Sequence, residues 1–121
     1  CAYAESVGAN TVYHGAAQVD TQAGYWDGSN EFMAAINSLT SLNRKHRIKI
    51  EAPLIELSKK EIIQWGHELD VNFGNTWTCY EGKDKACGEC TACSSRLQGF
   101  IDAGVEDPIE YSREIPWSTL V

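Results

Sequence analysis

Four cysteines within fifteen residues constrain this chain more than any other feature of its sequence. They are Cys79, Cys87, Cys90 and Cys93, with the spacing C-x7-C-x2-C-x2-C. A C-x2-C step lets two thiolates turn toward one point, and Gly88 eases the tight backbone within the first step. In a chain with the composition of a cytosolic protein, such a cluster more often binds metal than forms disulfides. We therefore predict one bound zinc ion, with two disulfides or a redox dithiol as the alternatives.

The predicted zinc is structural. Four cysteine ligands close the tetrahedral shell, whereas a catalytic zinc keeps one position open for water. The loop that carries the cysteines has little apolar content, so its folding should depend on the binding energy of the ion.

Composition and charge exclude several classes of protein. The 121 residues suit one domain, and 10 basic against 17 acidic side chains give a formal net charge of −7. Such a chain lacks the basic stripe that nucleic-acid binding requires. No apolar run reaches membrane-spanning length and no signal peptide opens the chain, so we expect a cytoplasmic protein without a membrane partner. Its first residue is Cys1, which suggests that the chain begins within an element.

Helix and strand signals alternate along the chain. Helices are predicted over Ala2–Val7, Glu31–Leu42 with Asn30 as N-cap, Lys59–Leu69 with a capping box from Ser58 to Glu61, and Ser94–Ala103 ending at Gly104. Strands are predicted from Asn10 to Gly15, where we expect burial, and over Arg47–Leu54, while Glu114–Val121 has strand propensity. Residues 20–30 are predicted to be a loop. This order is typical of an α/β domain with a parallel sheet.

Two loops follow the predicted strands, and ligands of such sheets gather at the carboxyl ends of the strands. The first loop combines carboxylates with aromatic rings, namely Asp20, Tyr25, Trp26, Asp27 and Glu31. Such a set can bind a planar base, although a solvated surface loop has the same composition. In the second loop, Lys59 begins a helix whose N-terminus favours anions. A phosphate contact is one interpretation of this lysine, and an exposed helix residue is the other.

Three segments resemble a known family. They are HGAAQVDTQAGYWDGSNEF at residues 14–32, PLIELSKKEI at 53–62, and the stretch from TWTCY to DPIEY at 76–111. Together they are similar to the 7-cyano-7-deazaguanine synthases, ATP-dependent enzymes of queuosine precursor biosynthesis. The similarity runs from about Tyr3 to Tyr111, and its most specific part is the cysteine cluster with the R-x-x-GF-x-x-AG-x-x-DP run after it.

The resemblance implies a fold and a reaction. The fold is the C-terminal half of a Rossmann-like, parallel-sheet domain of the PP-loop superfamily, joined to a four-cysteine zinc module. Residues 1–74 would belong to the nucleotide- and substrate-binding domain, and residues 75–121 to the zinc module with its C-terminal helix and tail. The family is a carbon–nitrogen ligase that uses ATP, with Mg²⁺, to convert 7-carboxy-7-deazaguanine and ammonia into the nitrile.

The resemblance also assigns roles to residues, although it identifies no catalytic residue. The four cysteines would hold the zinc, while Gly15 and Lys59 would contact the nucleotide. The deazaguanine pocket would be lined by Asp20, Tyr25, Asp27, Glu31 and Phe32.

Two departures from the family pattern shape what we expect of this chain. The loop carries Gly28 and Ser29 where the family has cysteine and arginine, and the phosphate-binding loop SGGxDS is absent from these residues. We therefore expect the C-terminal half of a ligase, inactive alone and working as a homodimer or with an N-terminal half. The alternatives are a related deazapurine enzyme with another substrate or nucleophile, and a non-enzymatic zinc-binding interaction module.

Overall fold

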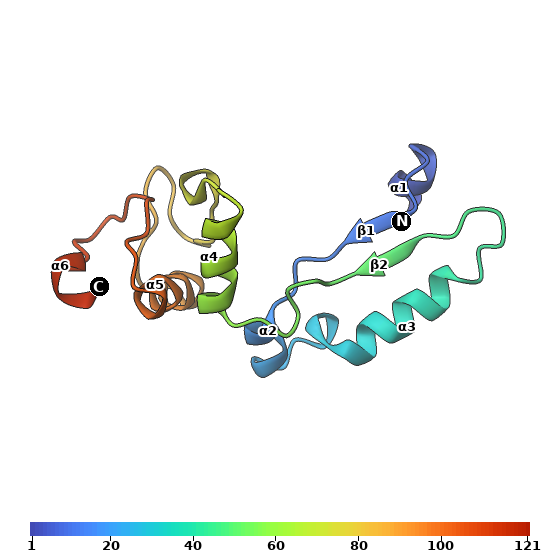
Figure 1. Ribbon diagram of the computed structural model, residues 1–121, viewed down its shortest axis with the longest axis horizontal. Helices are drawn as coiled ribbons and strands as arrows, with labels where there is room; N and C mark the ends of the chain where they lie inside the picture. The colour runs from blue at the N-terminus through green and yellow to red at the C-terminus, as the bar shows by residue number, and fades with distance from the viewer. The chain divides into compact units, whose positions relative to one another are not determined.

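Two short parallel strands form the sheet of this chain, as the computed structural model of residues 1–121 shows (Figure 1). Strand β1 spans Thr11–Tyr13 and strand β2 spans Lys49–Glu51, with Val12 opposite Ile50. The pairing continues beyond both ends of β1, because the Lys49 N–H donates to the Asn10 carbonyl at 2.8 Å and the His14 N–H donates to the Glu51 carbonyl at 2.7 Å. The predicted α/β class and parallel sheet are confirmed.

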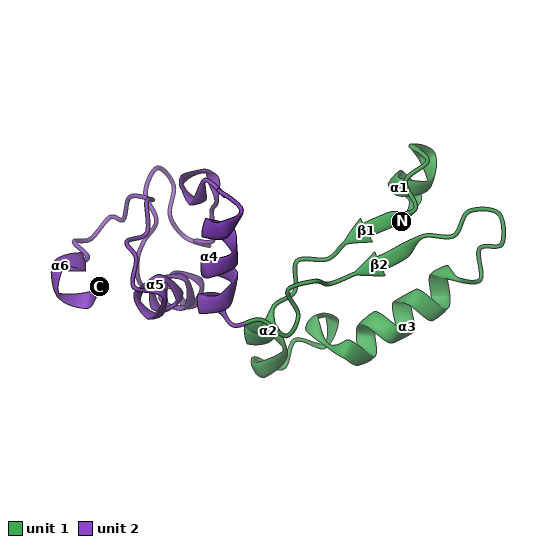
Figure 2. Ribbon diagram, in the orientation of Figure 1, with its two compact units in different colours: residues 1–57 green, residues 58–121 purple.

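The chain divides into two compact units, residues 1–57 and residues 58–121 (Figure 2). Each unit is described by itself below. The division after residue 74, between a nucleotide- and substrate-binding domain and a zinc module, is not tested by these units and stays a prediction. None of the helices combines the length and apolar character needed to cross a lipid bilayer.

Unit 1, residues 1–57, contains three helices besides the sheet. They are α1 (Ala2–Ser6), α2 (Gln18–Gln22) and α3 (Asn30–Thr40), with a short 3-10 turn at Trp26–Gly28. Helix α1 ends before Gly8, whose φ of +74° is the left-handed conformation predicted for a terminating glycine. Helix α3 runs beside β2 (Figure 1).

Three predictions for unit 1 were wrong in detail. Strand β1 is not buried, because Tyr13 is 70% exposed and unit 1 provides few elements to cover the sheet. Helix α2 begins at Gln18 and runs into the segment predicted as loop, and its start is stabilised by a hydrogen bond from the Ala17 N–H to the Asp20 carboxylate at 2.8 Å. The N-cap of α3 is Ser29 rather than Asn30, since the Ser29 hydroxyl accepts from the Phe32 N–H at 3.1 Å.

Unit 2, residues 58–121, is built on two packed helices, α4 (Lys59–Glu68) and α5 (Thr91–Ala103). The predicted capping box of α4 is confirmed, because the Ser58 hydroxyl accepts from the Glu61 N–H and the Glu61 carboxylate accepts from the Ser58 N–H. The helices approach closely at Gly99, where a Cβ would lie 2.6 Å from that of Lys59. The core between them is apolar and contains Ile63, Leu97 and Phe100.

In unit 2, the start of α5 and the C-terminal tail differ from the predictions. Helix α5 begins at Thr91, earlier than the predicted Ser94, because the Cys90 sulfur accepts from the Cys93 N–H and caps the helix. The tail predicted as a strand forms the short helix α6 (Trp117–Leu120), which follows Pro116. Proline fixes a φ suited to a helix start and lacks the N–H that a strand ladder needs.

Candidate metal centre and predicted ligand loops

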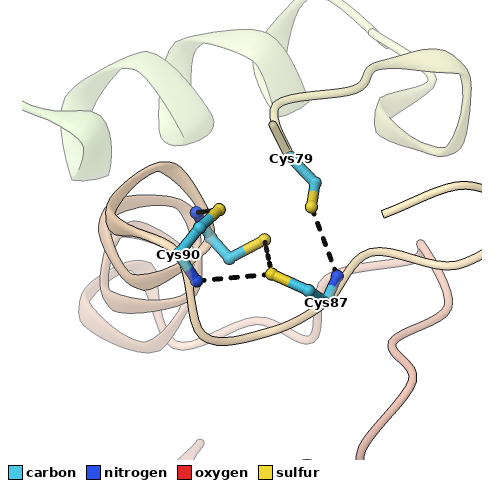
Figure 3. A group of neighbouring side chains, drawn as sticks. Cys79, Cys87 and Cys90 are labelled. Carbon is cyan, nitrogen blue, oxygen red and sulfur yellow. Dashed lines mark hydrogen bonds between the residues drawn. The ribbon is translucent and has the colours of Figure 1, made fainter. Parts of the chain in front are cut away.

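The four sulfur atoms of the predicted cluster lie together in unit 2 (Figure 3). All four Sγ atoms are within 4.8 Å of one another, and the Sγ atoms of Cys87 and Cys93 are 3.9 Å apart. Tetrahedral Zn–S bonds of about 2.3 Å place neighbouring sulfurs roughly 3.8 Å apart, whereas a disulfide needs about 2.05 Å. The spacing of the sulfurs fits a metal ion, and all four cysteines are free thiols.

Backbone amides surround the sulfurs of this cluster. The Cys79 sulfur accepts hydrogen bonds from the N–H groups of Gly82 at 3.0 Å and Cys87 at 3.3 Å. The Cys87 sulfur accepts in the same way from the Cys90 N–H at 3.3 Å. Amide donors favour the charged thiolate, which is the form that binds metal.

The electrostatic environment differs between the cysteines. The pKa of Cys79 is lowered to about 6, chiefly by the hydrogen bond from the Cys87 amide, and the pKa of Cys90 is lowered mainly by the Tyr80 amide. Burial raises the pKa of Cys93 to about 12. A dication at the centre would offset this penalty, because it favours the thiolate of a buried cysteine.

Glycines permit the tight turns of the cysteine loop. Gly88 has a φ of +78°, as expected for the glycine within the first C-x2-C step, and a Cβ there would lie 2.9 Å from the Arg113 Nε. At Gly82 a Cβ would lie 2.3 Å from the Lys85 carbonyl oxygen and 3.1 Å from the Cys79 sulfur. A side chain at Gly82 would therefore displace the loop from the cluster, and one at Gly88 would strain the left-handed backbone.

A buried ion pair, which was not predicted from the sequence, lies on the helix that carries Cys93 and on the segment after it. Arg96 on α5 and Asp107 are 7% and 5% exposed, and the Arg96 Nη2 donates to the Asp107 Oδ1 at 2.8 Å while its Nε donates to Oδ2. Burial is the largest single influence and lowers the pKa of Arg96, but the hydrogen bonds and negative charge of Asp107, together with Tyr111, outweigh it and the pKa is raised. Both residues belong to the R-x-x-GF-x-x-AG-x-x-DP run, so the pairing of its charged ends was the available signal.

The predicted substrate loop brings aromatic side chains together in unit 1. Phe32 is half-buried and packs edge-on against Trp26, with ring centroids 5.2 Å apart. The centroid of the His14 ring lies 6.2 Å from that of the Phe32 ring. His14 follows β1 directly, so its position at a strand's carboxyl end was the signal that could have added it to the predicted set.

The polar residues of the loop have different surroundings. Tyr25, Asp27 and Glu31 are exposed, and Tyr25 keeps 60% of its surface accessible. Asp20 is half-buried and one of its oxygens already caps α2. Gly28 is buried against Asp20, because a Cβ at Gly28 would lie 2.8 Å from the Asp20 Cβ. The loop thus presents two aromatic side chains, Tyr25 and Trp26, and two acidic side chains to solvent on a turn fixed by Asp20.

The two predicted nucleotide contacts belong to different units. Gly15 is exposed in unit 1 just beyond β1, with no atom within 4 Å of where a Cβ would be. Lys59 is the first residue of α4 in unit 2, and its side-chain stem packs against Gly99. Their joint contact with one nucleotide stays a prediction.

Comparisons with known proteins agree with these observations. Residues 1–104 match the family model described as "Queuosine biosynthesis protein QueC". Relatives named 7-cyano-7-deazaguanine synthase include those of Thermoplasma volcanium, 44% identical over 93% of this chain and 48% of the relative, and Caldicellulosiruptor bescii, 41% identical over 96% of this chain and 52% of the relative. The chain spans about half the length of the curated relatives it matches. On this evidence, the chain belongs to the QueC family of queuosine biosynthesis proteins.

Proposed function

We propose that this chain forms part of an ATP-dependent 7-cyano-7-deazaguanine synthase acting in the cytoplasm. The family match over residues 1–104 carries the proposal. The converging cysteine sulfurs support it, because the cysteines belong to the segment that resembles the synthases most specifically. The reaction would convert 7-carboxy-7-deazaguanine and ammonia into the nitrile.

The metal of the cluster is proposed to be zinc in a structural role. The four sulfur ligands have the softness and spacing that zinc prefers, and together they leave no coordination position for water. The ion would supply folding energy to the loop between Cys79 and Cys93. It would take no part in activating the substrate.

The loop of unit 1 is proposed to bind the deazaguanine. The exposed carboxylates of Asp27 and Glu31 can accept hydrogen bonds from the N–H edge of the base. Tyr25 and Phe32 can contact its planar faces, while Asp20 holds the turn in place. Gly28 and Ser29 leave this loop without the thiol and cation of the family pattern, which favours a test with related deazapurines as well.

ATP is proposed to make the substrate carboxylate reactive. A carboxylate is a poor electrophile until adenylation turns one oxygen into a leaving group, after which ammonia can displace AMP to form the amide. A second ATP would then drive loss of the amide oxygen to give the nitrile. Gly15 and the Lys59 ammonium would contact the nucleotide, and Mg²⁺ would accompany its phosphates.

The pyrophosphate is proposed to be held by a segment outside these 121 residues, supplied by an N-terminal half. Backbone amides of such a loop are what stabilise phosphate charge during transfer. The purified chain should therefore form no AMP from ATP and 7-carboxy-7-deazaguanine. AMP formation should appear when a polypeptide carrying the SGGxDS loop is added.

Variants of the loop test the assignment in the complemented protein. Asp27→Asn should weaken calorimetric binding of 7-carboxy-7-deazaguanine at least tenfold, because one carboxylate acceptor is lost. Asp84→Asn is the matched control, since Asp84 is also exposed and acidic but lies in the cysteine loop. A protein that binds one zinc and no deazapurine would instead be an interaction module, and tighter binding of another deazapurine would change the substrate.

A further inference from the structure

The Arg96 guanidinium contacts two segments of unit 2 besides its own helix. Its Nη1 donates to the Thr76 hydroxyl at 2.9 Å and reaches the Thr78 hydroxyl at 3.4 Å, while its Nη2 donates to the Phe73 carbonyl at 3.2 Å. On the other side it pairs with Asp107 through both carboxylate oxygens. The chain from Thr76 leads within three residues to Cys79. Arg96 thereby fixes the segment that delivers the first cysteine.

Asp107 extends the network to the loop that carries Cys87. The Tyr111 hydroxyl donates to the Asp107 Oδ2 at 2.7 Å. The segment that ends at Ser112 pairs with Ala86, because the Ala86 N–H donates to the Glu110 carbonyl at 3.0 Å and the Ser112 N–H donates to the Ala86 carbonyl at 2.8 Å. Ala86 is fully buried and directly precedes Cys87.

The remaining two cysteines are placed by the helix of Arg96 itself. Cys90 caps α5 and Cys93 lies in its first turn, three residues before Arg96. All three sulfur-bearing segments are therefore connected to the buried ion pair of Arg96 and Asp107. Helix α5 carries Arg96 itself, and the segment before Cys79 is bound to Arg96 through Thr76 and Thr78. The loop that carries Cys87 is connected to Asp107 through Tyr111 and its neighbours. None of these network side chains is itself a sulfur ligand.

We propose that Arg96 is a positioning residue of the metal centre, acting through Asp107 and Tyr111 to align the three segments before the ion binds. The inference rests on the metal site of the proposed function. Without the network, ion binding would also have to close the loops between the cysteines, and the entropy of closing them would reduce affinity. With the network in place, the ion meets sulfurs that are already close together.

Replacing Arg96 by lysine distinguishes the effect of its hydrogen bonds, which align the cysteine segments, from the effect of its positive charge. In the full 121-residue chain, Arg96→Lys retains the cation but loses the forked hydrogen bonds to Asp107, Thr76 and Thr78. We expect one Co²⁺ per chain with tetrahedral thiolate absorption in both proteins, and an affinity for Co²⁺ at least tenfold lower in Arg96→Lys. Tyr111→Phe removes only the bond to Asp107 and should lower the affinity severalfold.

The matched control uses an exposed ion pair that also joins the cysteine loop to the segment around Tyr111. Lys85 of the cysteine loop pairs with Glu110 at 2.8 Å, and both side chains are more than half exposed. Glu110→Gln weakens this pair without touching the buried network, so its Co²⁺ affinity should equal that of the unaltered chain.

Amide hydrogen exchange distinguishes alignment from general stabilisation. In the metal-free unaltered chain, the Ala86 and Ser112 amides should be protected, while in metal-free Arg96→Lys they should exchange freely and become protected again when Co²⁺ binds. Unchanged Co²⁺ affinity in Arg96→Lys, or free exchange of these amides in the unaltered metal-free chain, would overturn the proposal. If Arg96→Lys does not fold, Tyr111→Phe decides by the same two measurements. Absence of Co²⁺ binding by the unaltered chain would instead reject the metal site itself.

Discussion

The side-chain amide of Asn37 forms two hydrogen bonds with the backbone of Ile50. Its Nδ2 donates to the Ile50 carbonyl at 2.8 Å and its Oδ1 accepts from the Ile50 N–H at 2.9 Å. In a parallel pair, alternate residues direct their backbone groups away from the partner strand. Asn37 therefore satisfies the outer edge of β2 and joins it to α3.

Loss of this contact should destabilise unit 1. Asn37→Leu has a similar volume but leaves both Ile50 groups without their partners, which costs about 1–3 kcal/mol for an uncompensated polar group. Denaturant unfolding followed by NMR signals of unit 1 measures the change. Ser38→Ala is the control, because its hydroxyl bonds only within the exposed face of α3, and equal stability of both variants would contradict this role of Asn37.

The capping box of α4 should contribute measurably to the stability of unit 2. Ser58→Ala removes the acceptor of the Glu61 N–H and should lower the free energy of unfolding by about 1 kcal/mol. Thermal unfolding monitored by circular dichroism tests this value. Substitution of Ser118, in the short helix α6, by alanine provides a comparison, since no side-chain cap is present there. A larger loss for Ser118→Ala would be the contrary result.

The capping box of α4 was predictable because its two residues, Ser58 and Glu61, lie within four consecutive positions. The end of α5 at Gly104 was predictable because it also depends on a local residue type. The cysteine spacing was informative for a related reason, since short C-x2-C steps restrict the sulfurs to one neighbourhood. The helix ends and the convergence of the cysteines both depend on residues close together in the sequence, so neither needs knowledge of a distant segment.

The features that the sequence did not reveal depend on distant partners. The lengths and burial of β1 and β2 depend on what covers the sheet, and the tail could become a strand only with a neighbouring strand to pair with. The pairing of Asp107 with Arg96 crosses the C-terminal end of α5, so it could be recognised only in the folded chain. The proximity of Phe32 to His14 likewise joins the first turn of α3 to the end of β1.

Metal binding should strengthen as pH rises. The raised pKa of Cys93, about 12, means that its proton must leave when the ion binds, whereas Cys79, with a pKa of about 6, is already largely a thiolate at neutral pH. Zinc binding at pH 7 should thus release fewer protons than there are cysteine ligands, and affinity should fall as the solution is acidified through the pKa of Cys79. Calorimetry in buffers of different ionisation enthalpy counts the protons, and pH-independent affinity would contradict the assignment.

The most direct test of the central claim is the metal content of the purified chain together with the fold of Cys90→Ser. We predict one equivalent of zinc per chain, bound by four thiolates. In Cys90→Ser, the turns that carry Cys79 and Cys87 should lose their ordered NMR signals, while the signals of α4 and of the Ala86–Ser112 pairing remain. A metal-free chain in which the turns that carry Cys79 and Cys87 keep their native signals, or a Cys90→Ser variant in which they do, would contradict a structural zinc centre.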